Sequence, residues 1–227
     1  LCIASYFGNN TASKGGSVLI YGSHSSLWVM FSRTLFMFNY AFLDGGSIYL
    51  QYVNHFQIKH VIFKHNQAVS SGGNIYAVEG YELVSKNCSF INGMSGENAG
   101  SIFVNNLKKF RFYSSTISKC RAYSKNGGGI YLFGTTIEIS TNCVLINNFA
   151  KKSGGALYLN WMGDNSTLTI SQCRFSFNSA GFNGAAVYMS LPGSILLSYI
   201  LFRYNTAAQH GGALFVYLTS RTMNEIS

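Results

Sequence analysis

Proline, acidic side chains and charge in general are scarce in this chain. Of its 227 residues one is proline, seven are Asp or Glu, and charged residues make up 10%. Hydrophobic residues reach 48%, so the composition excludes a disordered tail and a coiled coil. The longest apolar run, 27–43, is interrupted by Arg33 and Asn39 and is not expected to span a membrane. What remains is a globular or fibrous chain that is rich in glycine and turns.

Basic residues outnumber acidic ones. Sixteen Lys and Arg against seven Asp and Glu give a formal net charge of +9, which favours an acidic partner wherever the cations cluster. A candidate basic patch consists of Lys108, Lys109, Arg111, Lys119, Arg121 and Lys125. An ordinary solvated face is the competing interpretation. We expect no nucleic-acid partner, because no recognition module is visible.

Five cysteines and three Asn-x-Ser/Thr sequons indicate an oxidising, secretory setting. The sequons give three candidate glycosylation sites. Asn165 is favoured because it lies in a long loop, Asn87 is the second site, and the amide of Asn9 is expected to be engaged in a ladder of turn residues. The repeat pattern described next is already running at Leu1, so we expect a segment of a longer extracellular protein that continues at both ends. Any membrane anchor would lie outside this segment.

Pairs of small residues recur every 27 to 30 residues and divide the chain into eight repeats. The pairs begin at Gly15, Gly45, Gly72, Ala99, Gly127, Gly154, Gly184 and Gly211. Three and five residues after the first member, each repeat has an apolar residue, as in Ile48 and Leu50. Between them seven repeats carry the aromatic row, which is Tyr49, Tyr76, Phe103, Tyr131, Tyr158, Tyr188 and Phe215. The alternation predicts a strand with aliphatic residues inside and aromatic residues outside.

A second pattern precedes each pair. A large apolar residue such as Phe63 lies nine residues before the pair, followed after three residues by Asn66 and after two more by Ala68. The fifth repeat, around Cys120, departs from this register by about one residue. Glycine supplies the positive φ of a tight corner, and each asparagine amide can bond to the asparagine of the next repeat.

Units of this length cannot bury an apolar face alone and must stack on their neighbours. We therefore predict an all-β fold, a right-handed parallel β-helix (solenoid) of about eight coils with 27–30 residues per repeat. It is expected to form a single domain over residues 1–227. Helical repeats are disfavoured, because the units lack an apolar period of three to four residues and are rich in Gly, Ser, Asn and aromatic residues.

Two motifs carry a family resemblance. Residues 45–49 (Gly-Gly-Ser-Ile-Tyr) and 202–207 (Phe-Arg-Tyr-Asn-Thr-Ala) resemble the repeats of chlamydial polymorphic outer membrane proteins. Similar pectin-lyase-like β-helix repeats occur in large surface proteins of protists. The resemblance covers the whole chain and implies a surface-exposed ectodomain with adhesive or recognition roles in a longer, membrane-anchored polypeptide. It transfers no catalytic residue and names no ligand.

Carboxylates form no row at equivalent offsets, as a polysaccharide lyase or hydrolase on this fold would need. Asp44 has no acidic residue at its offset in the other repeats, and Glu79 and Glu82 are interpreted as parts of a solvated loop. His60 and His65 are spaced so that they do not share a strand face. We expect no enzyme activity, no catalytic residue, no metal site and no cofactor.

Cys143 and Cys173 share one offset, eleven residues before their pairs, and are expected to be stacked neighbours. A strand spacing of about 4.8 Å lies within the Cα separation that a disulfide tolerates, so this pair is a candidate disulfide. A row of buried free thiols is the preferred interpretation, because a straight stack in register rarely gives the required dihedral angle.

The aromatic row is the candidate binding stripe. Stacked rings can bind sugars, pack against a partner, or only stabilise the ladder. We predict a non-enzymatic extracellular scaffold for recognition or adhesion within a larger cell-surface protein or complex. Its expected partners are other proteins or further domains of the same chain, and glycans are a further class. The alternatives are a carbohydrate-binding or degenerate carbohydrate-active β-helix, and a structural filament or coat component.

Overall fold

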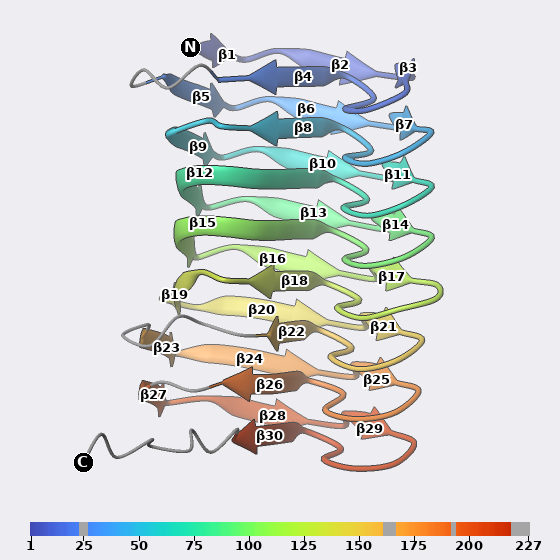
Figure 1. Cartoon of the computed structure of the whole chain (residues 1–227), viewed down its shortest axis with the longest axis vertical. Coiled ribbons are helices and arrows are strands. Elements are labelled where there is room, and N and C mark those ends of the chain that lie inside the picture. The colour runs from blue at the N-terminus through green and yellow to red at the C-terminus, as the bar shows by residue number, and fades with distance from the viewer. Residues whose placement is uncertain (23–26, 161–166, 192–193, 219–227) are drawn as a thin grey trace, which may run out of the picture.

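A computed structural model describes residues 1–22, 27–160, 167–191 and 194–218. The described strands, β1 to β30, wind into a right-handed parallel β-helix whose coils stack along one axis (Figure 1). All strand pairs within the described residues are parallel, and none of these residues is helical. The predicted fold class is confirmed.

Each coil crosses four faces, of which the first two form one 14-stranded sheet that bends at a corner. Face one contains β4 (Val18–Tyr21), β8 (Ile48–Gln51), the first parts of β12 (Ile75–Lys86) and β15 (Ile102–Tyr113), β18 (Ile130–Phe133), β22 (Leu157–Asn160), β26 (Val187–Leu191) and β30 (Leu214–Leu218). Face two contains β1 (Cys2–Ile3), β5 (Trp28–Ser32), β9 (His55–Lys59), the second parts of β12 and β15, β19 (Thr136–Ser140), β23 (Thr167–Ser171) and β27 (Ser194–Ser198).

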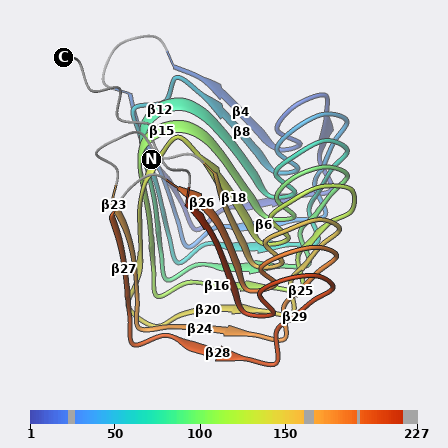
Figure 2. The same cartoon turned by 60° about the horizontal axis from the view of Figure 1, so that its bottom comes forward.

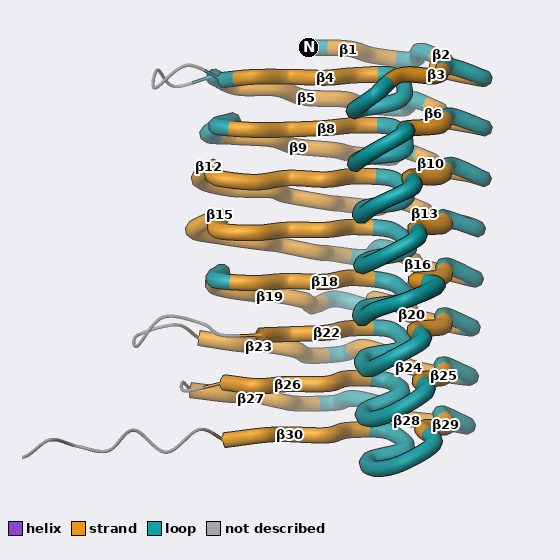
Figure 3. Tube along the Cα trace, turned by 45° about the vertical axis from the view of Figure 1, so that its right-hand side comes forward, coloured by secondary structure: helices purple, strands orange, loops and turns teal. Residues whose placement is uncertain are grey.

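Faces three and four are sheets of eight strands each. Face three contains β2 (Tyr6–Gly8), β6 (Leu35–Met37), β10 (Ile62–Lys64), β13 (Ser89–Ile91), β16 (Thr116–Ser118), β20 (Cys143–Ile146), β24 (Cys173–Ser176) and β28 (Leu201–Arg203). Face four contains β3 (Thr11–Ala12), β7 (Tyr40–Ala41), β11 (Gln67–Ala68), β14 (Met94–Ser95), β17 (Arg121–Ala122), β21 (Phe149–Ala150), β25 (Ser179–Ala180) and β29 (Thr206–Ala207). A loop after each face-four strand projects at the same corner of every coil (Figures 2 and 3).

The core lies between the faces and is built from rows of identical positions. The aliphatic row of face one points inward as predicted, and Ile48, Ile75 and Ile102 are fully buried. Face three contributes a stack of phenylalanines: Phe36 and Phe63 are buried, and their ring centroids are 4.9 Å apart. Stacking like on like buries each side chain against the coils before and after it, which a single coil cannot do.

The small pairs turn the chain from the projecting loop into face one. The first member has a positive φ in all eight coils, between 56° and 70°. The second member is held for a different reason, because a Cβ on Gly46 would overlap the carbonyl oxygen of Gly73 in the next coil. Glycine thus serves the conformation at one position and the coil spacing at the other.

Ala99 is the only first member that carries a side chain, and its φ is 56°. The left-handed conformation costs a non-glycine residue about 1–2 kcal/mol, and glycine would remove this strain. Glycine also increases the conformational entropy of the unfolded chain, which offsets part of the stabilisation. We therefore expect Ala99→Gly to raise the free energy of unfolding by about 0.5 kcal/mol in urea denaturation. A loss of stability in this variant would show that the methyl group of Ala99 contributes packing that outweighs the strain.

The predicted asparagine ladder is present inside the corner between faces three and four. Asn39 Nδ2 donates to Asn66 Oδ1 at 3.0 Å, and Asn148 Nδ2 donates to Asn178 Oδ1 at 3.1 Å. The prediction for Asn9 was wrong, because the neighbouring Asn10 occupies the ladder and donates to Asn39. Each amide also caps backbone groups that the corner removes from the sheets, which keeps buried polar groups satisfied.

The fifth repeat rejoins the common register within the sheets. Ile117 pairs with Phe90 and with Leu145, so it takes the large apolar position. Cys120 then fills the asparagine position, where its sulfur accepts the Gly93 N–H at 3.4 Å. The extra residue is therefore accommodated in the projecting loop after Ala122, where it disturbs no strand pairing.

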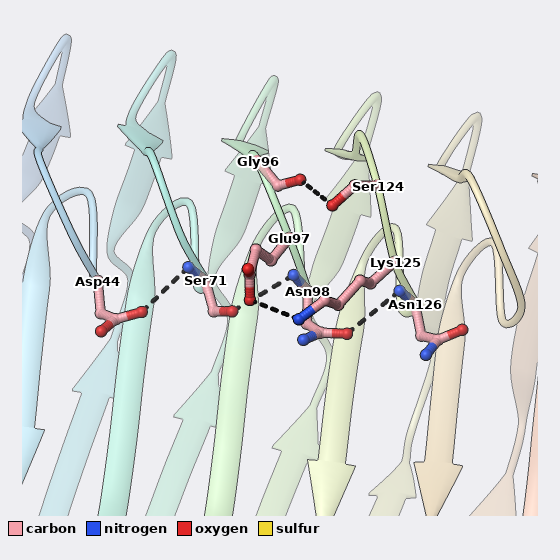
Figure 4. Close-up of polar contacts among 8 residues, drawn as sticks. All are labelled: Asp44, Ser71, Gly96, Glu97, Asn98, Ser124, Lys125 and Asn126. Carbon is pink, nitrogen blue, oxygen red and sulfur yellow. Dashed lines mark hydrogen bonds and ion pairs between the residues drawn. The ribbon is translucent and has the colours of Figure 1, made fainter.

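A second ladder holds the projecting loops together just before the small pairs (Figure 4). Asp44 Oδ1 accepts the backbone N–H of Ser71 at 3.1 Å, Ser71 Oγ accepts that of Asn98 at 3.3 Å, and Asn98 Oδ1 accepts that of Asn126 at 3.2 Å. Asp44 is thus used as a structural acceptor. Side chains bridge consecutive coils here and make the corner rigid.

Candidate functional site

The aromatic row runs along the outside of face one and forms a continuous ring stack. Consecutive ring centroids are 4.6 to 5.2 Å apart, with interplanar angles of 3° to 12°. Tyr49 is buried, the other six rings are half-buried, and Lys14 lies over the Tyr49 ring at 4.8 Å. Because each interior ring has a neighbour on both faces, a partner can reach ring edges but cannot stack on ring faces.

The tyrosine hydroxyls of this row stay protonated. Burial is the main cause that raises the pKa of Tyr76 to about 12. Burial likewise raises the pKa of Tyr158 and of Tyr131. These groups are therefore neutral hydrogen-bond donors and acceptors at physiological pH, and they supply no anion or nucleophile.

The structure divides the candidate basic patch among different parts of the coil. Lys108, Lys109 and Arg111 lie on β15, Lys119 lies at the corner after β16, and Arg121 and Lys125 lie in and after β17. The chain turns two corners between the first and last of these residues, so the six do not form one continuous surface. Residues that are close in the sequence of a solenoid can therefore lie on different faces of the coil.

Charged side chains of three coils, and a histidine of a fourth, converge on face two. Arg111 contacts Glu82 at 2.8 Å and Glu138 at 3.6 Å, and Tyr113 donates to Glu138 at 2.7 Å. His55 lies 3.6 Å from Glu82. Comparing equivalent positions of the repeats did not reveal this cluster, because that comparison looked for acidic residues at one shared position in each repeat. In the structure Arg111 pairs in register with Glu138 on one side and reaches Glu82 on the other.

This cluster ties coils together electrostatically. The guanidinium of Arg111 lies between the carboxylates of Glu82 and Glu138 and forms an ion pair with each. Burial, followed by the hydrogen bond to Glu138, raises the pKa of Tyr113, so its hydroxyl remains a donor. The arrangement has the chemistry of an interstrand ion pair. No group of three or more His, Cys, Asp or Glu side chains that could hold a metal ion occurs in the described ranges.

Cys143 and Cys173 lie in register on β20 and β24, and both are free thiols in this structure. Their sulfurs donate to backbone carbonyl oxygens, Cys143 to Ser140 at 3.0 Å and Cys173 to Ser171 at 2.9 Å. Both side chains point into the core, so they act as small apolar groups with weak donors.

Burial raises the pKa of the Cys120 thiol to about 12. We expect iodoacetamide at pH 8 to modify the half-buried Cys2 and to spare Cys120 until urea unfolds the chain, as read by mass spectrometry. Because the unfolded thiol ionises first, the contribution of Cys120 to stability is complete below about pH 9 and is lost towards pH 12. Equal modification rates for the two thiols in the folded protein would contradict this.

Two of the three sequon asparagines occupy exposed corners. Asn87 and Asn9 are exposed and have φ values of 53° and 56°. Asn165 lies outside the described residues. No helix long and apolar enough to cross a membrane is found in the described part of the chain.

The fold and its ladders define a right-handed parallel β-helix repeat protein, with Gly-Gly corners and an internal asparagine ladder. Residues 142–160 match the Chlamydia polymorphic membrane protein repeat. This segment runs from the β20 strand through the Gly154 corner to the end of β22, so it contains both sequence motifs of one coil. Neither the curated proteins nor the solved structures gave a match.

Proposed function

We propose that this chain is a non-enzymatic scaffold of a cell-surface protein, which presents a rigid surface for recognition or adhesion. The match to a membrane-protein repeat supports the surface location. The observation that carries the proposal is the unbroken register of two eight-stranded sheets with side-chain ladders at the corners. Such a rod holds outward side chains at fixed spacing over all its coils.

The use of the polar and aromatic groups supports a role without catalysis. Glu82 and Glu138 both form ion pairs with Arg111, and Glu97 is paired with Lys125 at 2.8 Å. The faces of the interior aromatic rings are covered by other rings of the same row. These groups stabilise the solenoid, and the surface that remains is suited to binding.

The surface location is tested with antibodies against the folded chain on intact and permeabilised cells of the source organism. We expect labelling of intact cells, and release of the epitope by external protease. Labelling only after permeabilisation would contradict the proposal. Crosslinking on intact cells followed by mass spectrometry would then identify the protein partners of the scaffold.

A filament or coat component is the structural alternative. It requires self-association, which light scattering of the purified chain measures directly. Concentration-dependent growth into long particles would favour the filament. A constant monomer mass would favour the recognition scaffold.

A further inference from the structure

Face three carries cations without carboxylates. We define the basic face as the outward side chains of face three together with its two bordering corners, all of which lie within the described ranges. Its charged residues are Arg33, Lys64, Lys119, Arg174 and Arg203. No Asp or Glu occurs among the residues that form this face. The acidic residues that the structure describes lie on the other faces and corners.

The five cations are exposed and available. The ion pairs within the described residues use His55, Arg111 and Lys125, and none of the five cations of the basic face. Two of them are oriented by neutral groups: Arg174 donates to Ser176 at 3.0 Å, and Arg203 donates to Tyr204 at 3.1 Å. Cations without nearby carboxylates create a positive potential that attracts an anionic partner.

The cations follow the axis of the rod. They belong to the second, third, fifth, seventh and eighth strands of face three, or to the corners beside these strands. With about 4.8 Å per coil, they are separated along the axis by about 5 to 10 Å. Between them lie neutral hydroxyl groups, including Ser89, Thr116 and Ser118. These cations and hydroxyl donors are spread over face three and both its corners and recur along the axis, which is complementary to an extended polymer with a repeating negative charge.

We propose that the basic face binds an acidic polysaccharide, laid along the axis of the solenoid. The inference rests on the proposed function and specifies the ligand class of one face. A bilayer is a weaker fit, because the rings at the corner after face three stack in pairs instead of projecting. Phe38 stacks on His65 at 5.1 Å, and Phe177 stacks on Tyr204 at 4.9 Å.

The test uses dextran sulfate as the probe and dextran of the same length as the uncharged control. The variant is the triple substitution Lys64→Ser, Lys119→Ser and Arg174→Ser. The matched control is Lys108→Ser, Lys151→Ser and Lys152→Ser, which removes the same charge from exposed positions away from the basic face. Circular dichroism establishes that both variants fold, and binding is measured by biolayer interferometry.

We expect the chain to bind dextran sulfate and not dextran, with an affinity that falls as salt rises. The basic-face variant should bind at least about tenfold more weakly, and its salt dependence should be shallower, because fewer cations contact the polymer. The control variant should stay within about twofold of the original chain. Equal losses in the two variants would reduce the effect to net charge and overturn the proposal.

Two other outcomes also overturn it. One is the absence of dextran sulfate binding at low salt. The other is tighter binding to vesicles of phosphatidylcholine and phosphatidylserine than to dextran sulfate, which would assign the face to a membrane. If antibodies still label intact cells, either outcome removes the polysaccharide and leaves the surface scaffold in place.

Discussion

Replacing Asn66 by alanine is expected to lower the free energy of unfolding by about 3–5 kcal/mol, because it leaves several buried polar groups unpaired at once. Asn66 Nδ2 donates to the Phe36 carbonyl oxygen at 3.0 Å and to Asn74 Oδ1 at 2.9 Å. Its Oδ1 accepts from both the backbone and the side chain of Asn39 at 3.0 Å. Urea denaturation followed by circular dichroism measures the loss.

Lys64→Ala is the matched control, since Lys64 is exposed in the same coil. Its effect should stay within about 0.5 kcal/mol. If Asn66→Ala were as mild as this control, the ladder would contribute little. Water entering the corner would then have to satisfy Phe36 and Asn74 in its place.

Phe63→Ala should cost a similar amount, about 3–5 kcal/mol, for an apolar reason. The Phe63 side chain is fully buried, and its ring stacks on Phe36 and on Phe90 at 4.9 Å each. Alanine leaves a cavity that neighbours in a fixed ladder cannot fill, because each is held in register by its own coil. Thermal unfolding of the variant should show the loss as a lower midpoint.

Tyr76→Ala provides the comparison on the outside of the solenoid. Tyr76 also stacks on two rings, but it is half-buried, so its loss opens a gap to solvent and not an internal cavity. We expect about 1–2 kcal/mol for this variant. Equal losses at Phe63 and Tyr76 would show that the aromatic row contributes to stability as much as the core.

The repeated motif determined the fold, because the same pattern of apolar, glycine and asparagine positions occurs in successive repeats along the chain. The aliphatic row, the positive φ at the small pairs and the asparagine ladder were each predicted from offsets alone. A strand period and a turn residue act locally, and stacking extends each local preference along the axis. Even the fifth repeat obeyed the pattern once Ile117 was recognised as its apolar residue.

The surface was less accessible to sequence reasoning. The candidate basic patch joined residues that are close in the chain, whereas the basic face joins Arg33, Lys64, Lys119, Arg174 and Arg203 across seven coils. The ion pairs of Arg111 likewise connect coils through unequal offsets. The basic face and the Arg111 ion pairs both depend on the direction in which each corner of the coil turns the chain. The spacing of the sequence motifs does not predict that direction.

The sequence by itself thus determined the architecture, the inward rows and the need for glycine at the corners, because these follow from periodicity and backbone sterics. Only the tertiary structure decided which charges share a face, and it also showed that the faces of the aromatic rings are covered. The physical reason is that a solenoid brings together residues separated by about one repeat. Interactions between outward side chains therefore depend on three-dimensional register, while the core depends on a pattern that every repeat carries.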